Sequence, residues 1–331
     1  MRPISWPHPS PASHIIEQWY RTFVFPNPEE VLMLFLRRMT CKQTLLQLES
    51  FFNYSTGVGS SRISAACIAF RDWICERAGF TLKRVNPQQV KKYEEAVWKK
   101  FKEKWHENYE QAPLPPRKYV CTFLDGHRVN ICRPGKINNL PNVDVQNLFY
   151  TFYTKTHNLL WLLLVAPDGL SQWLSPVEVG RHADGFIWSQ HAEAQDLQEQ
   201  FSQQQRILNF LYSIYADSAF EGSIICHRPH ARNRATEHET RENFIWCKLR
   251  VSVEWVFGEI EQMFPYITCT NVLKVANNKR DYGIARLFEA LVLMRNIHVC
   301  VRGSNASRYF GIRPPTLVEY LRRDNYREAR L

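Results

Sequence analysis

The spacing of apolar residues changes once along this chain, and that change limits what it can fold into. Between residues 27 and 118 apolar residues recur at helical spacing, whereas aromatic and β-branched runs separated by turn residues follow the Pro-rich stretch at 113–116. We therefore predict a helical N-terminal region, residues 1–115, and a larger α/β domain over residues 116–331.

The N-terminal region is predicted to contain three helices, over residues 27–39, 42–52 and 61–80. The first opens with a capping residue, a proline and two acids, and the third is expected to stop at Gly79. A Gly-containing turn joins the last two, which is typical of a helix-turn-helix over about 27–80; an ordinary helical bundle fits the same pattern. The residues that would face a DNA groove are Ser60, Ser61, Arg62 and Ser64.

The larger domain is expected to combine an antiparallel meander with helices. A charged helix over 84–118 precedes it. Strands are predicted at 118–126, 127–131, 146–154, 157–169 and 170–176. They are followed by a helix at 183–205, a buried strand at 206–220, and helices at 243–263 and 283–300. We interpret this order as an α/β fold, a mixed sheet with helices packed on it.

Charge and composition narrow the classes of partner. The formal net charge is +10 and the pI is about 9.2, so the surface is expected to attract polyanions, nucleic acid before membrane. The longest apolar stretch, 159–166, is far shorter than the roughly 20 residues of a membrane span, and we expect no membrane partner. Scattered cysteines favour a reducing compartment. The densest candidate zinc set, which also fits a basic surface loop, is Cys226, His227, His230, His238 and Cys247.

Acids at the ends of predicted strands indicate a metal site. Asp125 follows one strand and precedes Gly126, and Asp217 follows the buried strand. Neighbouring strands of an open α/β sheet would bring the two carboxylates within a few ångströms of each other at the carboxyl ends. Because such carboxylates repel each other, a divalent cation such as Mg²⁺ is implied between them. Taken singly, Asp125 is equally a turn residue and Asp217 equally a helix cap.

Glu254 is an acid within an apolar helical stretch, "RVSVEWVFGEI" at residues 250–260. Its apolar neighbours form a stripe that can pack on a sheet, while an adjacent edge carries Arg250, Glu254, Gly258 and Glu261. The lack of a side chain at Gly258 leaves open space beside the carboxylate, although a surface pair with Arg250 explains the residue equally well. Asp184, in "GRHADGF", is either a further site acid or the cap of the helix that it begins.

Four ordered motifs lie between about residues 117 and 321. They are "FLDGHRVNICRPG", "VAPDGLSQWLSPVEVGRHADG", "YSIYADSAF" and "NFIWCKLRVSVEWVFGEIEQMF". Together they resemble the DDE endonuclease domain of PIF/Harbinger-type transposases and their domesticated relatives. The spacing from Asp217 to Glu254 is similar to that of many such cores, and the tail "RPPTLVEYL" is similar as well. The N-terminal helices also resemble the helix-turn-helix that precedes this domain in the family.

The resemblance implies an RNase H-like fold and a set of site residues. Asp125, Asp217 and Glu254 are implied as the catalytic, metal-holding triad, with Asp184 as an additional metal ligand. The implied chemistry is two-metal phosphodiester cleavage with Mg²⁺ or Mn²⁺. Transposon ends would be nicked first, and the freed 3′-hydroxyl would then attack target DNA.

The expected partners follow from the same resemblance. Double-stranded DNA, both transposon ends and target, is the expected substrate, with contacts from Ser61, Arg62 and Arg250; Arg250 is also expected to orient Glu254. A Myb-like helper protein and a nuclear location are implied, with the cytoplasm as the location in the absence of that helper. We also expect a homo-oligomer.

Departures from the family pattern favour a second interpretation. Ala183 occupies the position of the usual His before the second Asp, Ala216 and Phe220 replace a Gly and a Tyr, and Glu261 stands where many relatives carry Lys. Fewer positively charged side chains near the site would weaken binding to DNA. A domesticated DNA-binding protein with reduced catalysis is therefore the alternative, and an RNase H-like hydrolase of RNA or small phosphates is a third.

Overall fold

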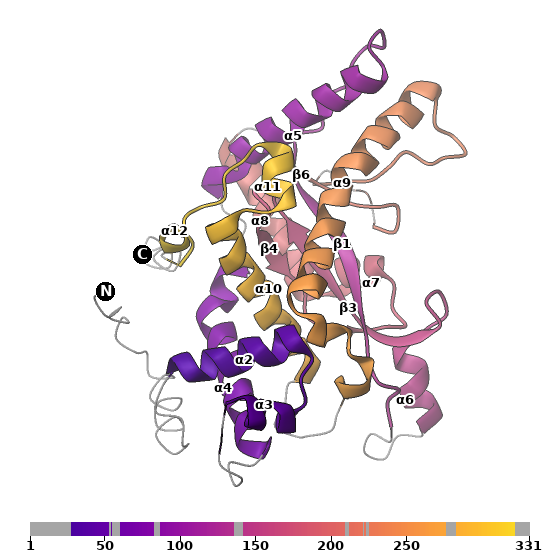
Figure 1. Ribbon diagram of the computed structural model, residues 1–331. Helices are drawn as coiled ribbons and strands as arrows, with labels where there is room; N and C mark the ends of the chain where they lie inside the picture. Colours follow the sequence, from indigo (N-terminus) through magenta and orange to yellow (C-terminus); the bar gives the residue numbers. More distant parts are fainter. Residues whose placement is uncertain are drawn as a thin grey trace.

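A mixed sheet lies at the centre of the protein, with helices on both of its faces (Figure 1). The computed structural model describes residues 28–52, 54, 60–82, 87–135, 142–208, 212–220, 222, 225–275 and 283–321. Within these ranges the strands are β1 (Val120–Asn130), β2 (Tyr150–Thr151), β3 (Thr156–Val165), β4 (Ser171–Leu174), β5 (Glu178–Val179), β6 (Ser213–Tyr215) and β7 (Cys226–His227). The prediction of a mixed sheet flanked by helices is confirmed.

The sheet is built around the long pair β1 and β3, which run antiparallel. The strand order is β2-β3-β1-β6-β7, and β4 and β5 also pair with β3. The pairs β3 with β4 and β3 with β5 are antiparallel, whereas β6 runs parallel to β1 and β7 parallel to β6. The change from antiparallel to parallel pairing therefore falls at β1, the strand that carries the first predicted site acid.

β1 is one continuous strand rather than the two that we predicted on either side of Gly126. Asp125 pairs with Leu163 and Gly126 with Leu162, without interruption. The apolar run of β3 offers backbone partners to β1 from Phe123 to Asn130, on both sides of Gly126, so a single glycine does not end the strand. The prediction that Asp125 ends a strand is therefore wrong, because it lies inside β1.

The strand predicted at 146–154 begins as a helix and keeps only two strand residues. Helix α6 (Asn142–Phe149) is followed by only two strand residues, Tyr150–Thr151. Val145 and Phe149 lie one helical turn apart and are both buried, so this aromatic segment buries its apolar side chains with helical rather than strand periodicity.

The single helix predicted at 183–205 is divided into α7 (Asp184–Gln190) and α8 (Ala192–Leu208). His191 between them has an extended backbone, with φ −80° and ψ 131°, and its Nε2 lies 2.7 Å from Glu178 Oε2. Because α8 continues to Leu208, the strand predicted over 206–220 shrinks to β6.

Different helices cover the two faces of the sheet. One apolar cluster includes residues of α9 and α10 against β1 and β3, and the second includes residues of α7 and α8 against β1, β3 and β6.

No helix in the described ranges combines the length and apolar character needed to span a bilayer. The remaining bounds are α2 (Pro28–Cys41), α3 (Leu45–Phe51), α4 (Ser60–Leu82), α5 (Pro87–Asn108), α9 (Glu237–Met263), η1 (Pro265–Thr268), η2 (Thr270–Val272), α10 (Gly283–Arg302), α11 (Asn305–Phe310) and α12 (Leu317–Leu321).

The N-terminal helices form where predicted, with one correction. α4 runs through Gly79 to Leu82 rather than stopping there. It packs against α2 and α10, and the Sγ of Cys75 donates to the Arg286 carbonyl at 3.3 Å. Most of the turn before α4 and the side chains of Ser61 and Arg62 lie outside the described part. The helix-turn-helix therefore stays a prediction, as does the domain boundary near residue 115.

Candidate active site

Carboxylates gather beside β1, where its parallel neighbour β6 stops. The pairing of β1 with β6 ends at Phe123 opposite Tyr215. Asp125 and Asp217 each lie two residues beyond that pair, and parallel strands bring such residues to the same end of the sheet. The structure therefore places the first two predicted acids next to each other, although one lies within a strand and the other follows one.

Asp125 lies in an environment that disfavours its negative charge. Its side chain is 13% exposed. Burial raises the pKa of Asp125 to about 6; Arg250 opposes this rise, while the charges of Asp217 and Asp184 add to it. These three carboxylates thus lie close enough to repel one another.

Asp184 reaches this group because β1 has no side chain at Gly126. A Cβ at Gly126 would lie 2.0 Å from Asp184 Oδ2, so another residue at this position would displace the carboxylate. Burial raises the pKa of Asp184, and Arg128 acts against that rise. The alternative role of Asp184 as a helix cap is wrong, because Ala183 holds the cap position of α7 and no side chain caps this helix.

Arg128 ties Asp184 to the backbone around it. Its Nη2 lies 3.1 Å from Asp184 Oδ1 and donates to the His182 carbonyl at 3.1 Å, while its Nη1 donates to the Gly180 carbonyl at 2.8 Å. An arginine with several fixed acceptors has few alternative positions. Arg128 therefore holds the carboxylate in place.

The loop after β6 packs against the first turn of α7. Asp217 Oδ1 accepts a hydrogen bond from the Ala219 amide at 2.7 Å. A Cβ at Gly185 would lie 2.4 Å from the Ala219 carbonyl oxygen, so the glycine beside Asp184 allows this close approach. The first turn of α7, which carries Asp184, is thus in direct contact with the loop that carries Asp217.

Helix α9 supplies Arg250 and Glu254 from the other side of β1. Arg250 Nη1 pairs with Asp125 Oδ2, and Arg250 Nη2 lies 3.4 Å from Glu254 Oε1. The Glu254 side chain is 52% exposed. The open space expected beside it is present, because a Cβ at Gly258 would meet nothing within 4 Å. Glu254 thus joins the cluster through Arg250.

The donor set was tested as a metal site. In the described part of the chain, no group of three or more His, Cys, Asp or Glu side chains is arranged to hold a metal ion, and this includes the zinc candidates around Cys226 and His230. His230 instead lies 3.2 Å from Glu239 and 3.3 Å from Glu242. The chemistry of the β1 cluster does fit a hard divalent cation, because such cations take carboxylate oxygens as ligands. Burial, and then the charges of Asp217 and Asp184, raise the pKa of Asp125, and a bound cation would oppose that rise. In the structure, the positive charge next to Asp125 and Glu254 is the guanidinium group of Arg250.

Two residues that shape the site had no role in the sequence prediction. Gly126 and Arg128 both lie in the motif that contains Asp125, "FLDGHRVNICRPG". A glycine directly after a site acid indicates close approach of another group. Nothing local indicates that Arg128 would pair with an acid 56 positions away.

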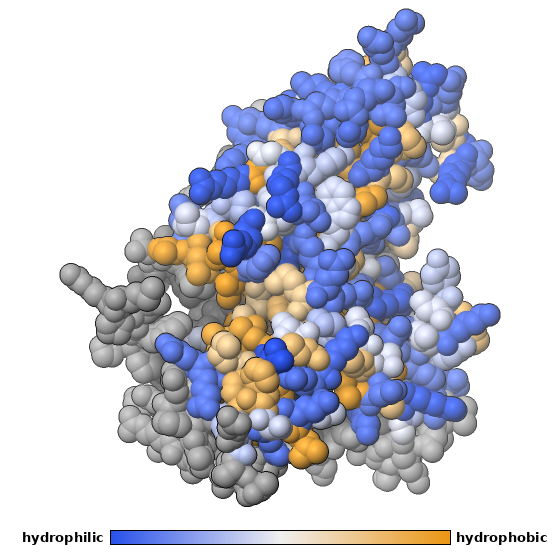
Figure 2. Space-filling model, viewed as in Figure 1, coloured by the Kyte–Doolittle hydropathy of each residue, from blue (hydrophilic) through white to orange (hydrophobic). Residues whose placement is uncertain are grey.

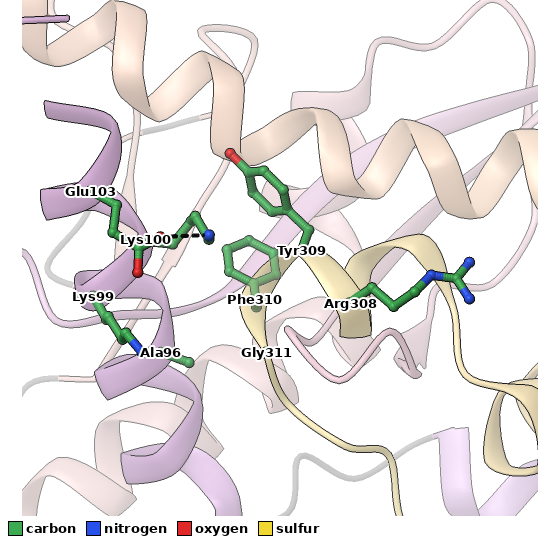
Figure 3. Close-up of a pocket in the computed structure, with 8 residues that line it drawn as sticks. All are labelled: Ala96, Lys99, Lys100, Glu103, Arg308, Tyr309, Phe310 and Gly311. Atoms are coloured by element: carbon green, nitrogen blue, oxygen red, sulfur yellow. Dashed lines mark hydrogen bonds and ion pairs between the residues drawn. The ribbon is translucent and has the colours of Figure 1, made fainter. Parts of the chain in front are cut away.

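A basic pocket lies between α5 and α11, and none of the site acids lines it (Figure 3). Lys100 within it lies 2.6 Å from Glu103 and 5.1 Å from the centre of the Tyr309 ring. That ring packs edge-on against Trp255, the neighbour of Glu254 on α9. Hydrophilic residues cover most of the visible surface over α5 and α9 (Figure 2). The positively charged side chains of this pocket therefore lie near α9 but are not part of the acid cluster.

Comparison with known proteins identifies the family of this chain. Residues 124–296, just over half of the chain, match the family described as DDE superfamily endonuclease. No curated protein matches. A solved structure, the Mos1 transposase paired-end complex with left transposon end, is similar at 10% identity and a TM-score of 0.27, over 89% of this chain and 86% of that one. The matched residues include all four predicted site acids and both arginines that pair with them, and the chain belongs to the DDE superfamily endonucleases.

Proposed function

We propose that this protein is a transposase-type DNA endonuclease of the PIF/Harbinger type, which cuts and joins phosphodiester bonds at transposon ends. The observation that carries the proposal is the cluster of Asp125, Asp184 and Asp217 beside β1, with Glu254 linked to it through Arg250. Membership of the endonuclease family supports it. In this proposal Asp125, Asp217 and Glu254 are the catalytic acids.

The proposed reaction needs divalent cations, Mg²⁺ or Mn²⁺. Asp125, Asp217 and Glu254 would hold them, with Asp184 as an additional ligand. When bound, such ions activate a water or 3′-hydroxyl nucleophile and stabilise the leaving oxygen. Arg250, which contacts both Asp125 and Glu254, would orient these carboxylates or bind a DNA phosphate.

We further propose that residues 116–331 form an RNase H-like endonuclease domain and that residues 1–115 form a helical region with a helix-turn-helix over about 27–80. Ser61 and Arg62 would contact DNA there. The basic surface of α5 and α11, with Lys99 and Arg308, would bind DNA phosphates. A Myb-like helper protein, a homo-oligomer and a nuclear location belong to the same proposal.

The test is nicking of a labelled duplex that carries the DNA flanking the gene at its own locus. Wild type and Glu254→Ala are compared in Mg²⁺, Mn²⁺ and chelator. Glu237→Ala is the matched control, because Glu237 lies on the same helix and pairs with Arg241 at the same i,i+4 spacing. Metal-dependent nicking that is lost only in Glu254→Ala supports the proposal. Nicking that persists in Glu254→Ala contradicts it, and preference for RNA points to an RNase H-like hydrolase.

A domesticated DNA-binding protein is the second candidate. The observation that favours it is the ion pair between Arg250 and Asp125, which already compensates the charge that a metal would neutralise. This function predicts salt-dependent binding to duplex DNA, no nicking with either metal, and the same affinity for wild type and Asp125→Ala. Arg62→Ala would weaken DNA binding under both functions.

A further inference from the structure

The loop that joins β2 to β3 exposes two aromatic side chains. Phe152 is 85% exposed and Tyr153 92% exposed, at the tip of a hairpin whose strands pair Tyr150 with His157 and Thr151 with Thr156. The loop extends from the edge of the sheet on the side where α7 lies (Figure 1). Water contacts nearly all of both rings, which is unfavourable for apolar surface.

The base of this hairpin is tied to the acid cluster. Thr151 Oγ1 donates to the Gly180 carbonyl at 2.6 Å, and Arg128 donates to the same carbonyl at 2.8 Å. Arg128 also lies 3.1 Å from Asp184 Oδ1. One arginine therefore links the hairpin base to a site carboxylate.

A Cβ at Gly180 would lie 2.3 Å from Asn158 Oδ1 and 2.4 Å from the Asn158 carbonyl oxygen. The shared carbonyl is thus packed tightly against β3. The position of the hairpin relative to Asp184 is accordingly set by close backbone packing.

The surroundings of the tip suit a nucleic acid strand. Lys155 in the same loop and Arg181 before α7 are both exposed cations. Phe186, two residues after Asp184, is a further aromatic that is 40% exposed. Flat rings beside cations are the elements with which proteins bind unpaired bases and their phosphates.

A protein partner fits the tip less well. Two aromatic side chains bury at most about 500 Å², whereas a stable protein interface buries about 800 Å² on each partner. The two rings match the size of one or two nucleobases instead.

We propose that Phe152 and Tyr153 stack against unpaired bases of the DNA end whose backbone lies at the acid cluster. This inference rests on the proposed function and names the feature of the substrate that is recognised: a frayed end rather than an intact duplex. Stacking of one base on an aromatic ring strengthens binding by about 5- to 150-fold.

The test compares binding of the full chain to a duplex and to the same duplex with one end made single-stranded, by fluorescence anisotropy. We expect the Phe152→Ala/Tyr153→Ala double variant to lose at least about tenfold in affinity for the frayed DNA and to bind the intact duplex as wild type does. The Phe152→Trp/Tyr153→Trp variant should keep the preference. Phe244→Ala removes an aromatic that is 45% exposed on α9 and should bind both DNAs as wild type does.

The inference would be overturned if the double alanine variant lost equal affinity for both DNAs, or lost affinity for neither. It would also be overturned if the variant changed only the oligomeric state measured by sedimentation, because the tip would then be a contact with a second copy of the chain. If wild type nicks DNA and the double alanine variant binds the frayed DNA as tightly as wild type does, the stacking inference is wrong but the proposed function stands. Wild type that binds neither DNA would contradict the proposed function itself.

Discussion

Two arginine–aspartate pairs lie beside β1, and they differ in how they are held. Arg128 pairs with Asp184 and also donates to two backbone carbonyls, at Gly180 and His182. The hydrogen bonds and ion pairs of Arg250 described in the structure go to carboxylates, those of Asp125 and Glu254. The guanidinium of the first pair is fixed to backbone carbonyls, whereas that of the second is held by carboxylate side chains. The comparison indicates one arginine that positions an acid and one that is available for chemistry.

The largest expected effect tests the first pair. Arg128→Ala should lower the free energy of unfolding by about 3 kcal/mol, because it leaves the buried Asp184 carboxylate without its ion pair and the His182 carbonyl without the Arg128 donor, while the Gly180 carbonyl keeps only its bond from Thr151. Arg250→Ala should cost only about 1 kcal/mol, since Asp125 can take up a proton when its partner is lost. Urea denaturation at pH 7 measures both. Equal losses would remove the distinction between the pairs.

The second prediction concerns the glycine that admits Asp184. Gly126→Ala should reduce the nicking rate by about 100-fold, because the new methyl group displaces the carboxylate while β1 itself continues. Gly258→Ala is the control for folding, because its Cβ meets nothing within 4 Å and alanine favours helix. A Gly126→Ala protein with the wild-type rate would show that the position of Asp184 is unimportant.

The third prediction uses the raised pKa of Asp125. An acid with a pKa of about 6 in the folded protein, against 3.8 as its ordinary value, binds its proton more tightly when folded, so stability is lost as pH rises through this window. Asp125→Asn, which carries no charge, should therefore be about 3 kcal/mol more stable than wild type at pH 7 in chelator, and equal to it below about pH 3.

Thermal or urea unfolding across this pH range measures the difference between the two proteins. The pKa of His127 is lowered to about 4 by burial, and its titration falls in the same window. It affects both proteins alike and cancels in the difference. A difference that does not change with pH would show that the Asp125 carboxyl is not perturbed.

The smallest effect tests the second pair. Arg250→Lys should reduce the nicking rate by about tenfold, because an ammonium group cannot contact Asp125 and Glu254 with a planar fork. Single-turnover nicking in Mg²⁺ measures the rate. A lysine variant with the full rate would show that Arg250 neither orients Glu254 nor contacts a phosphate in the way proposed.

Much of the fold was predictable where short-range patterns decide it. The helix over Pro28–Cys41 follows from its cap, proline and acids, and the helix that carries Glu254 follows from its stripe of apolar residues, although it begins at Glu237 rather than at the predicted residue 243. The apolar stripe Val253, Val256, Phe257 and Ile260 is buried as predicted. The boundaries of short elements were less predictable, because helix and strand patterns over six or seven residues are alike.

The sequence by itself determined the mixed α/β class and the long helices, and it singled out the acids that we propose for the site, since these depend on local spacing and on motifs. Only the tertiary structure decided that Gly126 lies within a strand and that Asp184 approaches it. It also decided that Arg128 pairs with Asp184 and Arg250 with Asp125. The physical reason is distance along the chain. Contacts between residues tens of positions apart depend on how sheet and helices pack, and no local pattern encodes them.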